Sequence, residues 1–156
     1  MIAALRELTV ARNGEVIIPA KPGKHSASNL CLDGLTPLIA GTFRGKRLTF
    51  SFDTGANKSD LYPPFFKAYE EEIKAKYPSL VEKITGVGRS REIIAYRVKD
   101  LVMTFSGKEA RFAEIPVLSE LTLDGSRYFY GNLGQDLIKQ FERMTISFET
   151  MSVLFD

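Results

Sequence analysis

A chain of 156 residues is about the length of one domain and is long enough to bury a core. Hydrophobic residues make up 44% and charged residues 26%, which are ordinary globular values and exclude a disordered or fibrous class. The 21 basic residues nearly balance the 19 acidic ones, so the net charge of +2 gives no reason to expect nucleic acid as a partner.

No apolar run approaches the length that spans a bilayer, so no membrane span is predicted. Residues 1–5 are apolar but few, and neither a basic lead nor a small-residue cleavage site accompanies them, so they are not a signal peptide. A trimmed start would have lost such a signal, so the compartment is undetermined and the periplasm stays open. Cys31 has no partner for an internal disulfide, and His25 lies in a polar stretch that is typical of a loop.

The first half of the chain reads as short strands. A β-branched run at 16–20 is followed by a polar loop at 21–29. Residues 37–43 and 47–52 form two further runs, which a short connection at 44–46 joins as a hairpin. In the second run apolar residues alternate with polar ones, which predicts one buried face made of Leu48, Phe50 and Phe52.

The period then changes from two to three or four residues. This spacing predicts an amphipathic helix with an apolar stripe made of Phe66, Tyr69, Ile73 and Tyr77. Pro63 and Pro64 suit the first turn of that helix, and Pro78 ends it. Residues 79–82 have the spacing of a capping box and suggest a further short helix.

The strand period returns after residue 92. Three strands are predicted at 93–98, 101–105 and 111–118, then a short helix at 135–141 and a final hairpin of 144–148 with 151–155. The fold class that follows is mainly β, a small closed barrel with one or two short helices.

One polar stretch, SFDTGANKSDLY at residues 51–62, directly follows a buried strand. Asp53 has an ordinary interpretation as a turn residue, with Gly55 supplying the backbone freedom. A functional interpretation is that a loop presents its carboxylate from a rigid strand. A second stretch favours this interpretation, because YGNLGQDLIKQF at 130–141 turns from a strand ending in glycine directly into a helix.

These two stretches resemble the two motifs of the retropepsin-like aspartic peptidases, and most closely the bacterial cellular members. The active-site segment of that family matches Asp53, Thr54, Gly55, Ala56 and Ser59, and its second motif matches the segment NLGQDLI with Leu133 and Gly134. The resemblance covers residues 35–156, which would form the peptidase domain, and leaves residues 1–34 as an N-terminal extension outside it.

The resemblance implies an aspartic endopeptidase that needs no metal or other cofactor. Two carboxylates would activate one water, and because like charges a few ångströms apart do not both ionise, the pair would share a proton. The chain has a single Asp-Thr-Gly, so the second carboxylate would be Asp53 of another subunit in a homodimer. Thr54 would bond across the dimer axis, Gly55 would lie beside the peptide substrate, and Ala56 would line the binding site.

Residues 85–96 lie where the family places a flap, a hairpin that closes over the substrate. Its tip would be Gly86, Val87 and Gly88, for which an ordinary turn is the alternative. Gln135 and Asn57 replace the arginine and the acid that form an ion pair in viral members, so the viral dimer geometry does not carry over directly. A second function therefore stays open, a retropepsin-like domain that binds an extended peptide or a protein without cutting it.

Overall fold

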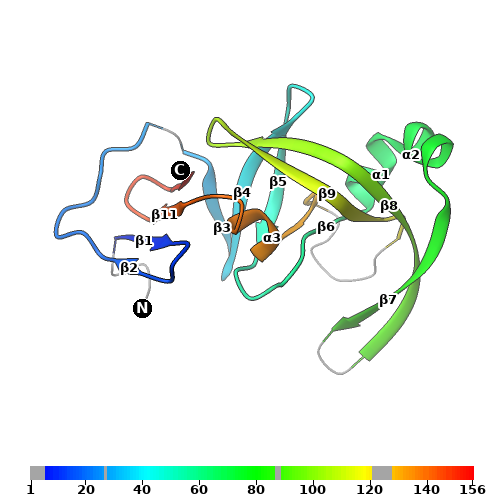
Figure 1. Cartoon of the computed structure of the whole chain (residues 1–156), viewed down its shortest axis with the longest axis horizontal. Helices are drawn as coiled ribbons and strands as arrows, with labels where there is room; N and C mark the ends of the chain where they lie inside the picture. Colours follow the sequence, from blue (N-terminus) through cyan, green and yellow to red (C-terminus); the bar gives the residue numbers. More distant parts are fainter. Residues whose placement is uncertain (1–5, 27, 87–88, 121–127) are drawn as a thin grey trace.

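The computed structural model describes residues 6–26, 28–86, 89–120 and 128–156 (Figure 1). Within these residues the chain is mainly β, as the sequence predicts, with three short helices. The strands are β1 (Glu7–Ala11), β2 (Val16–Ile17), β3 (Leu30–Asp33), β4 (Thr36–Phe43), β5 (Lys46–Phe52), β6 (Asp60–Leu61), β7 (Ser79–Gly86), β8 (Arg89–Phe105), β9 (Lys108–Leu118), β10 (Gly131–Leu133), β11 (Arg143–Ser147) and β12 (Ser152–Phe155). The helices are α1 (Pro63–Ala68), α2 (Glu70–Lys76) and α3 (Gln135–Ile138).

The strands form two sheets. One has four strands in the order β12-β11-β1-β2, and the other has eight in the order β3-β4-β5-β10-β6-β9-β8-β7 (Figure 1). Thr42 of β4 also pairs with Thr104 of β8, so the larger sheet bends back on itself. None of the described helices is long and apolar enough to cross a bilayer.

The core lies inside the larger sheet and extends toward the smaller one. The alternation predicted for β5 is confirmed, because Leu48, Phe50 and Phe52 are 3%, 0% and 4% exposed. Leu61 of β6 and Leu133 of β10 join them with no exposed surface. The two strands that flank the predicted active-site loop are therefore anchored through one face in the core.

The segment 1–34 contributes strands to both sheets. β1 pairs with β11 from the end of the chain, and β3 pairs with β4. The loop after β2 is tied to β1 through Glu7, whose carboxylate accepts the Gly23 N–H and lies 2.9 Å from His25 Nε2. Burial by itself would raise the pKa of Glu7, but the bonds from His25 and Gly23 outweigh it and lower that pKa. His25 thus has a structural role in holding this loop.

Two predictions about the helical region are wrong. The single helix is divided at Tyr69, whose φ of −133° and ψ of 21° leave the helical range. Its ring lies against Phe43 and Phe65, with centroids 5.2 and 4.8 Å apart, so tertiary packing outweighs the helical period. Residues 79–82, predicted as a helix, belong to β7, because pairing with β8 supplies backbone partners that a local pattern cannot show.

The strands predicted at 93–98 and 101–105 are one long strand, β8. Between them the register passes from Lys99 opposite Glu114 to Leu101 opposite Phe112, and the intervening Asp100 has a φ of 52°. The polar residues that suggested a break therefore mark a local irregularity inside a continuous strand.

Candidate active site

The Asp53 loop begins where β5 leaves the core. The Asp53 N–H donates to the Leu133 carbonyl at 2.9 Å, which extends the parallel pairing of β5 with β10 by one residue. The Gly55 N–H donates to Asp53 Oδ1 at 2.9 Å, and the Ala56 N–H donates to the Asp53 carbonyl at 3.1 Å. Asp53, Thr54 and Gly55 are exposed, so a rigid turn presents an accessible carboxylate.

The structure brings the two sequence motifs together. The Gln135 N–H donates to the Ala56 carbonyl at 2.8 Å, and Gln135 Nε2 donates to the Thr54 carbonyl at 2.6 Å. A Cβ on Gly134 would lie 2.6 Å from the Ala56 carbonyl oxygen, so only glycine fits there without movement of the backbone. Gln135 therefore supports the Asp53 loop through its side chain.

Ser59 and Asp136 form a second connection behind the loop. Ser59 is 1% exposed, and its N–H donates to both Asp136 carboxylate oxygens at 2.9 Å. Its Oγ donates to Asp136 Oδ1 at 2.5 Å and accepts the Gly134 N–H at 3.0 Å. The sequence named Ser59 as a support residue, but it did not identify Asp136 as its partner. The only available signal was an acid in the first turn of the helix after the second motif.

A row of polar residues crosses three strands beside Asp53. In the strand registers Ser51 of β5 lies opposite Asn132 of β10, which lies opposite Asp60 of β6. Ser51 Oγ donates to Asn132 Oδ1 at 2.8 Å. Their neighbours Phe52, Leu133 and Leu61 are all in the core, so the three polar side chains share the other face of the sheet. We call Ser51, Asn132 and Asp60 the polar row.

Asp60 is the most strongly perturbed acid of this region. Burial raises its pKa to about 7, and the negative charges of Asp136 and Glu82 add to the effect. Tyr62, two residues further on, also has a raised pKa, because it is buried and lies near the charges of Asp60 and Asp53. Asp60, Tyr62 and Asp53 are therefore electrostatic neighbours on one side of the sheet.

The raised pKa of Asp60 predicts a pH-dependent stability. Between its ordinary value of 3.8 and about 7, the folded state holds a proton that the unfolded state releases, so stability falls as pH rises through this window. Asp60→Asn removes the effect, and since partial contact with water screens the charge we expect the variant to be more stable than wild type by roughly 2–3 kcal/mol at pH 8 and nearly equal at pH 4.

Urea unfolding at both pH values measures this difference. Asp33→Asn is the matched control, because Asp33 is exposed and its substitution is expected to have no such pH dependence. A constant difference between wild type and Asp60→Asn across the two pH values would contradict the assignment.

The predicted flap is the hairpin of β7 and β8, which projects beyond the other strands (Figure 1). Gly86 is the last residue of β7 and pairs with Arg89. Val87 and Gly88, named with it as the tip, lie outside the described residues.

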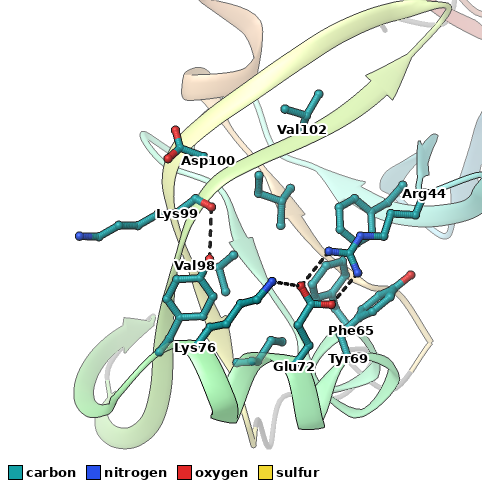
Figure 2. Close-up of a pocket in the computed structure, with 13 residues that line it drawn as sticks. Arg44, Phe65, Tyr69, Glu72, Lys76, Val98, Lys99, Asp100 and Val102 are labelled. Atoms are coloured by element: carbon teal, nitrogen blue, oxygen red, sulfur yellow. Dashed lines mark hydrogen bonds and ion pairs between the residues drawn. The ribbon is translucent and has the colours of Figure 1, made fainter.

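Two hollows of the surface are not lined by Asp53. Figure 2 shows a depression of about 390 Å³ in which Glu72 lies between Arg44 and Lys76. The hydrogen bonds from Arg44 and Lys76 lower the pKa of Glu72 to about 2, so these three charges are already paired with one another. An apolar cavity of about 500 Å³ lies between β1, β11 and α3, and Thr54 and Gln135 belong to its wall.

Among the described residues, no group of histidine, cysteine or acidic side chains is placed to hold a metal ion.

Comparison of the sequence with protein-family models and with curated proteins found no match. The case for a function therefore rests on the residues of the site and their geometry.

Proposed function

We propose that the chain is an aspartic endopeptidase of the retropepsin type, active as a homodimer in which each subunit contributes Asp53. The observation that carries the proposal is the exposed Asp53 carboxylate on a loop held by both motifs. The bending of the larger sheet, through the pairing of β4 with β8, is compatible with the small closed barrel of that class.

A single chain does not complete the proposed site. Within the described residues no hydrogen bond or ion pair joins a second carboxyl group to Asp53. Asp60 belongs to the polar row beside Asp53, but the charges that act on it are those of Asp136 and Glu82. A twofold axis beside the exposed loop would supply the missing carboxylate from a second copy of Asp53.

The chemistry requires one ionised and one protonated carboxyl group. The ionised Asp53 takes a proton from water as its oxygen attacks the peptide carbonyl carbon, and the protonated Asp53 donates to the carbonyl oxygen. The tetrahedral species then collapses, the C–N bond breaks, and the amine leaves with a proton from the dyad. The bond from Gly55 N–H fixes the orientation of each carboxylate before the substrate binds.

Dilution tests the requirement for two chains. Peptide cleavage is measured at acidic pH over a series of protein concentrations. Activity per chain is expected to fall steeply once the protein concentration is below the dimer dissociation constant, because the lone chain has half of the site. Light scattering or native mass measurement gives that constant independently. Activity that stays proportional to concentration far below it would show that one chain carries a complete site, with Asp60 and Asp136 the acids to test next.

Mixing sharpens the same test. Asp53→Asn chains mixed with wild type in equal amounts should leave about one quarter of the dimers fully wild type, if pairing is random. Activity is then expected to drop to about one half of its value when wild type is diluted by an equal amount of an inert protein, because wild-type chains alone would form twice as many fully wild-type dimers. Stable peptide binding without any cleavage by wild type would instead favour the non-catalytic binding domain.

A further inference from the structure

The hairpin of β7 and β8 presents apolar side chains to Tyr62, which lies two residues after Asp60 of the polar row. Ile93, Ala95 and Leu118 form a buried cluster against which Tyr62 and Leu80 pack. Leu80 lies opposite Ala95, and Glu82 lies opposite Ile93, so these four residues share the face of the hairpin that meets Tyr62. The charges of Asp60 and Asp53 both act on Tyr62, so this apolar wall and the two acids meet around one side chain.

Among the residues that the structure describes, Asp60 differs from the acids around it in having no hydrogen-bond donor or cation from another residue on its carboxyl group. Glu82 forms an ion pair with Arg97, and Asp136 is held by Ser59. Among the described residues, the Asp60 carboxyl accepts a hydrogen bond from its own backbone N–H and is repelled by the charges of Asp136 and Glu82. A buried acid without a cation is costly to keep, and the proposed chemistry at Asp53 does not use it.

We propose that Asp60, with Asn132 and Tyr62, forms a substrate subsite that selects a basic side chain, lysine or arginine, next to the bond cut at Asp53. This inference rests on the proposed function and adds its substrate class. The aliphatic stem of such a side chain lies against Tyr62 and the apolar wall, while its charged end reaches Asp60. The Asn132 amide adds a polar group in the same row.

The proposed dimer repeats this subsite. Each chain carries one polar row, so the twofold axis places a second copy on the other side of the scissile bond. An extended peptide that crosses the axis then meets an acidic subsite before and after the bond that is cut. The preferred substrate carries basic side chains at equivalent distances on both sides.

The preference also depends on pH. The groups that face Asp60 are Asp136, Glu82 with its partner Arg97, Tyr62 and, across Tyr62, Asp53. A bound ammonium or guanidinium stabilises the ionised form of Asp60 and so displaces its proton. Selection for lysine therefore increases as pH rises toward about 7, near which the carboxyl of the empty subsite loses its proton.

A set of octapeptides tests the subsite. The peptides share one apolar sequence and differ at a single position, which is lysine, norleucine or glutamate, and the position is moved along the peptide in successive sets. Mass spectrometry locates the cut, and kcat/KM is compared for wild type, Asp60→Asn, Asp60→Val and the exposed control Asp33→Asn. We expect wild type to favour lysine over norleucine by about tenfold or more, as for one charge-assisted contact. Asp60→Asn loses most of this preference and Asp60→Val reverses it, whereas Asp33→Asn keeps it.

The outcomes separate this inference from the proposed function. Cleavage with no preference for lysine, or an equal preference in Asp60→Asn, overturns the subsite and leaves the peptidase intact. If wild type cuts none of the peptides, the peptidase proposal fails, and fluorescence polarisation of the labelled peptides then tests the subsite by itself. Tighter binding of the lysine peptide than the norleucine peptide, lost in Asp60→Asn, supports it, and equal or absent binding overturns it.

Discussion

Replacing Asp53 by asparagine is expected to reduce peptide cleavage by at least about a thousandfold, because both carboxylates that activate the water are lost from the dimer. The fold is expected to stay within about 0.5 kcal/mol of wild type, since the side chain is exposed and the substitution conserves its shape. The amide oxygen of asparagine still accepts the Gly55 N–H that now bonds to Asp53 Oδ1 at 2.9 Å. Cleavage rates measured together with urea unfolding separate the chemical from the structural effect.

Asp33→Asn makes the same chemical change at an exposed site on β3 and is expected to keep full activity. Cleavage by Asp53→Asn at the wild-type rate would contradict the aspartic mechanism. The exposed and unpaired thiol of Cys31 would then be tested as the nucleophile through Cys31→Ser.

The parts of the fold that could be predicted from the sequence are those with strong local signals. Alternation in β5 places Leu48, Phe50 and Phe52 in the core, and the turn after residue 52 places Asp53 outside it. A short hairpin connection at 44–46 correctly joins β4 and β5. In each case the residues that decide the structure are neighbours in the sequence, so their pattern carries the information.

The parts that could not be predicted depend on partners far away in the sequence. Residues 79–82 form a strand because β8 lies beside them, and Tyr69 leaves the helix because Phe43 and Phe65 hold its ring. The same holds for the site, where Asp60 acquires its environment from residue 132 across the sheet and from Glu82 on the hairpin. A sequence pattern identifies an acid but not the register that places it.

The difference between local and distant constraints also explains why two glycines of the site, Gly55 on the Asp53 loop and Gly134 in the second motif, differ in importance. At Gly55 the atom nearest to an added Cβ is the side-chain oxygen Asp53 Oδ1, which at 3.2 Å would have to move by only a few tenths of an ångström. Gly134 has no such room, because its neighbours are main-chain atoms of the opposite motif. Gly55 therefore affects the position of the Asp53 side chain, whereas Gly134 allows two segments of backbone to lie in contact.

Gly134→Ala is accordingly expected to destabilise the fold by more than about 3 kcal/mol, a large part of the stability of a typical domain. The φ of −117° and ψ of −157° at Gly134 suit any residue, so the cost comes from space alone. The added Cβ would lie 2.6 Å from the Ala56 oxygen and 3.0 Å from the Lys58 oxygen. Relief of that contact requires separation of α3 from the Asp53 loop, which also breaks the bond from Gln135 N–H to the Ala56 carbonyl.

Gly55→Ala is the matched variant, with the same added methyl group on the Asp53 loop, the other of the two segments that meet in the site. Its stability is expected to change by less than about 1 kcal/mol, because only a carboxylate oxygen has to move by a few tenths of an ångström. Its kcat/KM is nevertheless expected to fall by at least about tenfold, since that oxygen belongs to Asp53 and its position sets the attack on the substrate. Urea unfolding and peptide cleavage on both variants check the contrast. Equal stability loss in the two would show that the motifs are not locked through Gly134, and unchanged activity in Gly55→Ala would show that the orientation of Asp53 Oδ1 does not govern the reaction.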